Sequence, residues 1–207
     1  MRYSIGTIVW LLSFGIVLVW SGISPTDRFT WWLEVAPALL ALPVLAFTRK
    51  RFPLTPLAYS LILAHCVILM VGGHYTYAQV PLFDLLREPL GWTRNNYDKL
   101  GHLAQGFVPA LVAREVFLRL RVVKPGAWLA FITLCFALAL SAAYELVEWA
   151  VSVCTGEGAD EFLGTQGYIW DTQSDMLMAL VGAGLALILL SRMHDRALRK
   201  RGWIDAE

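Results

Sequence analysis

The sequence predicts an all-α, polytopic integral membrane protein with about six transmembrane helices and both termini in the cytoplasm. Of its 207 residues, 57% are hydrophobic and only 16% are charged, whereas a soluble domain carries about 25% charged residues. Mean hydropathy is +0.57, and several apolar runs approach the roughly 20 residues that a helix needs to cross a bilayer. This composition argues against a soluble enzyme and favours a single transmembrane domain over residues 1–207.

Six apolar segments are the expected membrane spans. They cover residues 5–23, 31–47, 56–73, 101–118, 126–153 and 171–193. Arg2 precedes the first segment as in a signal peptide, but no cleavage site of the A-x-A type follows, so we expect a permanent anchor. The fourth segment is the weakest of the six because it carries Arg114 and Glu115.

The lysine and arginine residues set the expected orientation, because cytoplasmic loops carry an excess of both. With both termini inside, thirteen of the 17 basic residues fall on the inner side. The outer side holds only Arg28, Arg87, Arg94 and Lys99. Removing any one span would scramble this bias, so the charge distribution favours the six-span arrangement.

The second outer loop contains an amphipathic stretch at about residues 81–92. Its sequence, PLFDLLREPLGW, places Leu and Phe among Asp, Arg and Glu at a roughly helical spacing. Pro81 suits the first turn of a helix. We therefore expect a short helix in the headgroup region, in contact with membrane lipids. A packed lid without a ligand is the alternative.

Acidic residues and one histidine mark the outer ends of the last three spans. They form three pairs, Asp98 with His102, Glu145 with Glu148, and Asp171 with Asp175. The members of each pair are three or four residues apart, which puts both on one face of a helix. Because the three helices alternate in direction, we expect all six side chains at one membrane depth and around one cavity.

Such a cluster needs compensation, because an ionisable group inside a span is costly unless it is paired or hydrated. A divalent metal ion is one solution, since carboxylates and histidine bind such ions well and build dinuclear sites in helical bundles. The other solution is that Arg94 and Lys99 balance part of the charge and the acids share protons. Asp98 and Asp171 also fit a plain role at helix starts. The second pair lies near a helix C-terminus, where the dipole disfavours anions.

Three further residues are possible additions to this site. His74 follows the third span at the outer end, and Asp160 and Gln166 lie in the loop TGEGADEFLGTQGYIW between the last two spans. A flexible, solvated acidic loop is the plain alternative for Asp160 and Gln166. For His74 the alternative is an interfacial residue that only forms hydrogen bonds.

Four segments form a specific combination of motifs. They are GGHYTYAQVPLFD at residues 72–84, NNYDKLGH at 95–102, YELVEW at 144–149 and GTQGYIWDTQSDM at 164–176. Together they resemble the YjdF-type family of bacterial inner-membrane proteins, over nearly the whole chain. The resemblance implies a multi-pass protein of the bacterial inner (plasma) membrane and no particular reaction.

A more distant similarity links the same positions to VanZ-like proteins, which are associated with teicoplanin resistance. That pattern has an Asp-Lys-x-x-His motif opening one helix, a glutamate closing the next and an aspartate pair opening the last. The three pairs described above, together with Lys99, occupy these positions. The chain departs from the pattern at Trp149 and in its long acidic loop, where VanZ-like chains tend to have glutamine and an arginine.

The sequence supports three functional hypotheses. The first is a metal-dependent membrane hydrolase or transferase acting on a lipid-linked or envelope substrate. In it the six clustered residues bind the metal, and Glu145, Glu148 and Asp175 take catalytic roles that include a general base. The second is a cation- or proton-coupled transporter, although we expect no charged pathway through the inner halves of the spans and find no internal repeat. The third is a non-catalytic membrane binding or assembly protein. The net charge of +1 gives no reason to expect a nucleic-acid partner.

Overall fold

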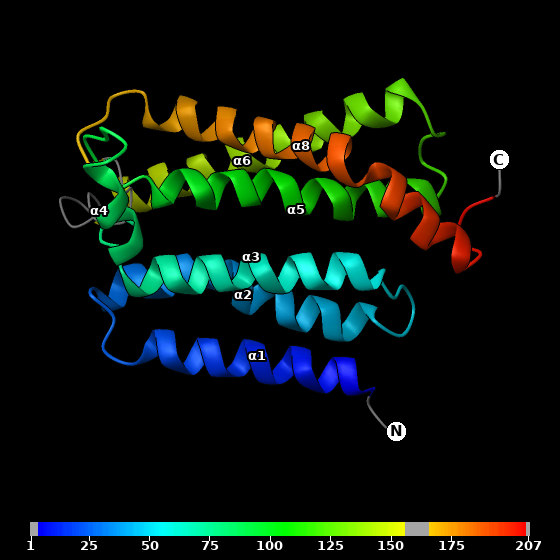
Figure 1. Ribbon diagram of the computed structural model, residues 1–207, viewed down its shortest axis with the longest axis horizontal. Coiled ribbons are helices and arrows are strands. Elements are labelled where there is room, and N and C mark those ends of the chain that lie inside the picture. Colours follow the sequence, from blue (N-terminus) through cyan, green and yellow to red (C-terminus); the bar gives the residue numbers. More distant parts are fainter. Residues whose placement is uncertain (1–3, 156–165, 206–207) are drawn as a thin grey trace.

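The fold is an all-helical bundle, seen in a computed structural model that describes residues 4–155 and 166–205 (Figure 1). Within those ranges there is no strand, and the predicted fold class, a polytopic helical membrane protein, is confirmed. The helices are α1 (Ile5–Gly22), α2 (Arg28–Thr48), α3 (Pro56–His74), α4 (Pro81–Arg87), α5 (Tyr97–Arg119), α6 (Ala127–Thr155) and α8 (Asp171–Lys200).

Five of the described helices, α1, α2, α3, α6 and α8, are long and apolar enough to cross a membrane. The fourth predicted span corresponds to α5, which has 23 residues but carries charged side chains near both ends. Helix α5 runs the length of the bundle beside the others (Figure 1). The sixth crossing therefore stays a prediction, supported by the length and position of α5.

Three helices begin at side chains that cap their first turns. Ser4, Asp27 and Thr55 each accept a hydrogen bond from the backbone N–H three residues further along. These caps satisfy donors that the start of a helix otherwise leaves free. Pro56 follows Thr55 at the first helical position, where a missing N–H breaks no intrahelical bond.

The bundle consists of two groups of three helices that meet along α3 and α5. Figure 1 shows α1, α2 and α3 in one group and α5, α6 and α8 in the other. Helix α3 packs on α1, α2 and α5, whereas α5 also packs on α6 and α8. Phe47, Trp128 and Ile188 are among the large apolar side chains that remain exposed. An apolar exterior of this kind is expected where helices face lipid.

Helices α5 and α8 cross with their backbones in direct contact. A Cβ atom added at Gly106 would lie 1.7 Å from the backbone oxygen of Ala179. One added at Gly182 would lie 2.0 Å from the backbone oxygen of Leu103. Small residues allow this close approach between membrane helices. The crossing therefore depends on glycine at both positions.

The amphipathic segment after α3 forms a shorter helix than predicted. Helix α4 ends at Arg87, whereas the sequence predicts a helix to about residue 92. Pro89 accounts for the difference, because proline lacks a backbone N–H and its ring clashes with the carbonyl oxygen four residues earlier. Leu82 and Leu85 are exposed on α4, as expected for a helix in the headgroup region.

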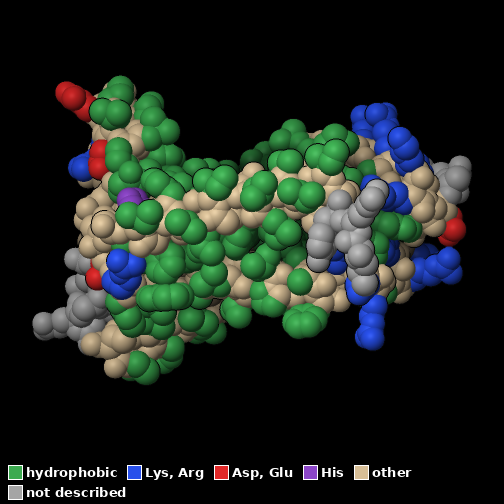
Figure 2. Space-filling model, turned by 90° about the horizontal axis from the view of Figure 1, so that it is seen from below, with side chains coloured by type: hydrophobic (Ala, Val, Ile, Leu, Met, Phe, Trp, Pro, Cys, Tyr) green, Lys and Arg blue, Asp and Glu red, His purple; other side chains and the backbone are tan. Residues whose placement is uncertain are grey.

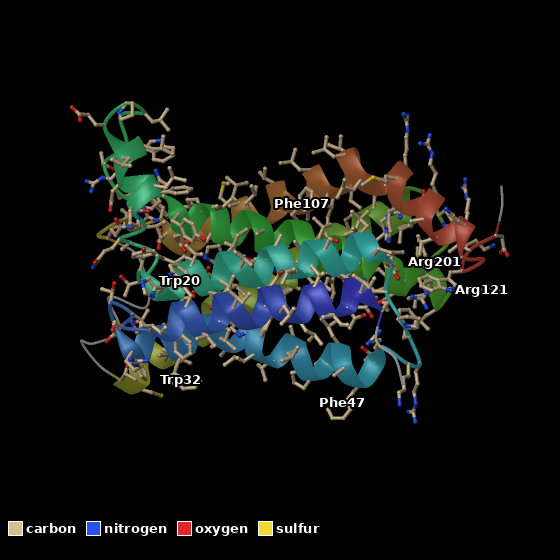
Figure 3. The ribbon with its side chains drawn as sticks, turned by 60° about the horizontal axis from the view of Figure 1, so that its bottom comes forward. Trp20, Trp32, Phe47, Phe107, Arg121 and Arg201 are labelled. Atoms are coloured by element: carbon tan, nitrogen blue, oxygen red, sulfur yellow. The ribbon has the colours of Figure 1, made fainter. Side chains whose placement is uncertain are left out.

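Basic side chains gather at the end of the bundle where the described chain begins and ends (Figures 1 and 2). Figure 3 shows Arg121 and Arg201 at this end, and Trp20 and Trp32 at the opposite end. By the positive-inside rule we expect the basic end to face the cytoplasm. The orientation stays a prediction.

Cysteine labelling in intact cells tests this orientation. Cys154 is exposed at the expected outer end, and Cys66 and Cys135 are the other two free cysteines. With those two changed to Ala, we expect a membrane-impermeant maleimide to label Cys154 from outside. Lys50→Cys in a chain without other cysteines should react only after permeabilisation. The reverse pattern would invert the topology.

The helix crossing gives a second prediction. We expect Gly106→Ala to lower the free energy of unfolding by about 1–3 kcal/mol or more, because the added methyl group has no space and overpacking is costly. Gly184→Ala on α8 is the matched control, since a Cβ there meets nothing within 4 Å. Unfolding in mixed detergent micelles, followed by circular dichroism, measures both. Equal stability of the two variants would contradict direct backbone contact.

Candidate functional site

The three predicted pairs come together at the end of the bundle opposite to the basic end. The first pair lies at the start of α5, the second in the second half of α6, and the third at the start of α8. All six side chains are buried, with between 2% and 8% of each residue exposed. The alternating directions of the three helices bring them to one level, as the spacing predicts.

Asp98, His102 and Asp175 form the tightest group. His102 Nε2 lies 3.3 Å from Asp98 Oδ1 and 3.9 Å from Asp175 Oδ2. One ligand atom from each of the three residues lies within 4.8 Å of the others. Two carboxylate oxygens and one imidazole nitrogen at this spacing are able to bind a divalent ion between them.

Two basic residues neutralise part of the acidic cluster. Lys99 Nζ lies 2.5 Å from Asp175 Oδ1 and 2.9 Å from Asp171 Oδ1. Arg94 Nη2 lies 2.7 Å from Asp171 Oδ1 and 3.4 Å from Asp98 Oδ2. Asp171 is therefore held by two cations. Asp98 and Asp175 each keep their second oxygen turned toward the imidazole.

Glu145 stands on the other side of His102. Its Oε1 lies 3.8 Å from His102 Nδ1, and neither atom has a hydrogen-bond partner within the described part of the chain. Buried polar atoms without a partner are uncommon. In metal sites a carboxylate at this position orients the ligating imidazole. The arrangement resembles that pattern, with Nε2 facing the two aspartates.

Two more glutamates lie beside the cluster. Glu148 is on the side that faces α2, and Glu34 is on α2 itself. Glu34 is 5% exposed, and the Tyr144 hydroxyl donates a hydrogen bond to its Oε2 over 3.5 Å. Neither glutamate forms an ion pair with a described Lys or Arg. Glu34 is absent from the predicted site. A lone carboxylate inside the apolar segment 31–47 is the signal that would have found it.

A cavity of about 310 Å³ continues from these two glutamates along the bundle, between α2, α3, α5 and α6. We call it the lateral groove. Its walls beyond the acidic end are mainly apolar and include Ala41, Val44, Ile62 and Val108. His102 lines its polar end. The apolar lateral groove therefore reaches Asp98 and His102 of the three-residue group.

Two of the three additional predicted residues, His74 and Gln166, lie apart from that group. His74 Nδ1 forms a hydrogen bond of 2.9 Å with a backbone carbonyl of α1, and its ring stacks on Trp20. Gln166 pairs with the backbone of Asn95, accepting from N over 3.1 Å and donating to O over 2.9 Å. Asp160 lies outside the described residues.

A second buried polar cluster occupies the basic end, where the sequence predicts none. Glu115 accepts hydrogen bonds from the Thr55 backbone and hydroxyl, and lies 3.0 Å from His194 Nε2 and 2.9 Å from Arg119 Nη1. Arg114 Nη1 lies 3.2 Å from the other ring nitrogen of His194. Both oxygens of Glu115 are thus engaged. The charges that weaken the fourth predicted span are paired within the bundle.

Comparison with known proteins gives the family of this chain. Residues 6–196 match the family described as "Predicted membrane protein (DUF2238)". The chain is also 52% identical over 193 residues to the inner membrane protein YjdF of Escherichia coli (strain K12). That alignment covers 93% of this chain and 92% of the relative. No solved structure gives a significant match.

These matches confirm the resemblance inferred from the four sequence segments. Together with the five apolar helices, they place the chain in the bacterial inner membrane as a multi-pass protein. The more distant similarity to VanZ-like proteins stays a prediction. Because the matched range covers nearly the whole sequence, the chain belongs to the DUF2238 family of predicted membrane proteins.

Proposed function

We propose that this protein is a metal-dependent membrane enzyme, a hydrolase or transferase acting on a lipid-linked or envelope substrate at the outer face of the inner membrane. The observation that carries the proposal is the Asp98–His102–Asp175 group, whose ligand atoms lie within 4.8 Å of one another. Carboxylate and imidazole groups are common ligands of divalent ions. Ionisable groups buried inside a membrane bundle are functional candidates by default.

Charge balance also supports an ion. The cluster around His102 contains five carboxylates from the predicted pairs, and its two permanent cations are Arg94 and Lys99. Burying unbalanced charge costs several kcal/mol per group. A divalent ion at the three-residue group would supply two of the three missing positive charges. Proton sharing among the acids is the alternative that the experiment below separates from it.

Different residues take different roles in this proposal. Asp98, His102 and Asp175 hold the ion, and Glu145 acts as a positioning residue that orients the imidazole through Nδ1. Glu148 faces the lateral groove and is placed to act as the general base. A bound ion would supply a Lewis acid that polarises a phosphoryl or ester oxygen of the substrate.

Three residues expected as metal ligands therefore have other roles here. Asp171 lies outside the group of three, and its Oδ1 is shared by Arg94 and Lys99. Glu145 and Glu148 lie outside the group of three whose ligand atoms come within 4.8 Å. The proposal keeps Glu148 and Asp175 at the reacting centre. Glu145 contacts His102 and does not bind the ion itself.

A cation- or proton-coupled transporter is the second candidate, and His65 favours it. His65 Nε2 is buried, has no hydrogen-bond partner among the described residues, and belongs to a side chain that lines the lateral groove. Together with the Glu115–His194 pair, it gives ionisable groups in the inner part of the bundle, where we expected no charged pathway. The complete pairing of Glu115 argues against this candidate, because a saturated carboxylate is a poor carrier of protons or ions.

Metal binding is the direct test of the proposed enzyme. In purified wild-type protein we expect a divalent ion to bind and to raise stability by about 2.7 kcal/mol when its free concentration is a hundred times Kd. Asp175→Asn and Asp98→Asn each remove a ligand and should abolish both effects. Elemental analysis and melting curves recorded with and without a chelator measure them. Glu88→Gln, at an exposed position in the outer loop, is the control and should behave as wild type.

The role of Glu145 gives a separate expectation. Glu145→Gln should weaken metal affinity by about 10–100-fold without abolishing binding, because outer carboxylates contribute to affinity by that factor. Titration with a competing chelator measures the change. The opposite result would be a wild-type protein whose stability does not change with a chelator, together with a stabilised Glu148→Gln variant. That result would support a proton-sharing cluster, in which removal of one acid relieves repulsion.

A further inference from the structure

We propose that the lateral groove binds one acyl chain of a phospholipid with a primary ammonium headgroup, and that Glu34 receives the ammonium while Glu148 beside it stays available as the general base. This inference rests on the proposed function, because it names the substrate class of the same site. The lipid phosphate would then face the Asp98–His102–Asp175 group. The occupant is argued from the position, depth and charge of the groove.

The mouth of the groove opens toward the lipid-facing surface. Helices α2 and α6 form its two edges, and they are not among the helix pairs that pack closely. Val44 on α2 and Leu140 on α6 both line the groove, yet they are 57% and 38% exposed. A residue that lines a cavity and also remains exposed lies at its entrance. A lipid chain can therefore enter sideways from the bilayer.

The depth of the groove corresponds to one leaflet. On α2 its lining runs from Glu34 to Leu45, which is about 16 Å of helix rise. The hydrocarbon core of a bilayer is roughly 30 Å thick, so the groove extends over about half of it. A single acyl chain of the outer leaflet has this reach.

The polar end of the groove selects the headgroup by charge. Glu34, Asp98 and Glu148 line it, and its lining contains no Lys or Arg. Asp98 is paired with Arg94 and Lys99, whereas the two glutamates lack such a partner in the described chain. A primary ammonium brings positive charge and three N–H donors. An anionic headgroup would bring the glutamates no positive charge and no N–H donors.

A separate observation also points to a missing group at this end. His102 is 5% exposed and lines the groove, and its Nδ1 faces Glu145 Oε1 over 3.8 Å, so that neither atom has a hydrogen-bond partner among the described residues. The acidic end is therefore incompletely satisfied by the protein itself. A zwitterionic headgroup would add donors beside the glutamates and an anion beside the proposed ion.

Native mass spectrometry of the full chain tests the selection. The probes are phosphatidylethanolamine, phosphatidylglycerol and phosphatidylcholine with identical acyl chains, added in equal amounts. We expect wild type to retain one phosphatidylethanolamine at least tenfold more than either of the others. Phosphatidylcholine is informative because its quaternary ammonium has the charge but no N–H donor. Equal retention of all three lipids would overturn the inference.

Two variants locate the bound lipid. Glu34→Gln should abolish the preference for phosphatidylethanolamine, while the control Glu88→Gln should keep it. Ala41→Trp fills the groove and should reduce retention of every lipid, with circular dichroism and melting curves confirming that the variant folds. Ala41→Leu is the milder version. Retention of phosphatidylethanolamine by folded Ala41→Trp would place the lipid elsewhere.

Metal content, measured on the same samples, separates this inference from the proposed enzyme. Glu34→Gln should keep the metal content of wild type, because Glu34 is outside the ligand group. A protein that binds metal without preferring phosphatidylethanolamine would refute only the lipid assignment. A protein that prefers phosphatidylethanolamine without binding metal would refute the enzyme and leave the groove as a lipid-binding site.

Discussion

The direct contact between α5 and α8 is the constraint on which the rest of the site depends. Gly106 and Gly182 let the two backbones touch. One turn outward from Gly106, the same α5 face carries His102, and one turn outward from Ala179 the matching α8 face carries Asp175. The helix separation therefore sets the distance between the imidazole and the carboxylate. A wider crossing would separate the groups that the proposed ion would bridge.

The two ends of the bundle handle buried charge in different ways. At the basic end, Glu115 is engaged by Thr55, His194 and Arg119. A network satisfied in this way fixes the packing of α3, α5 and α8 and offers no free ligand atoms. At the opposite end, acids outnumber cations and two facing atoms of His102 and Glu145 have no described partner. Fully paired charge suits a structural role, and unbalanced charge suits binding.

The proposed metal centre and the lateral groove share two residues but lie in different surroundings. Asp98 and His102 contribute to both. On one side of them α8 supplies Asp175 and the cation-bound Asp171. On the other side α2 supplies Glu34 and an apolar wall. A substrate with a charged head and a hydrocarbon chain satisfies both surroundings at once, because each part meets the environment that solvates it.

The sequence by itself determined the helical class, the approximate helical segments and the level of the acidic pairs, because apolar length and helical periodicity are local properties. The end of α4 at Arg87 is also a local effect, of Pro89, although the prediction of a helix to about residue 92 did not include that effect. Only the tertiary structure decided which acids face one another. Glu34 joins the site from α2, and His194 pairs with Glu115 across 79 residues. No local spacing encodes these contacts, since they arise from how two helix surfaces pack and how closely glycine lets them approach.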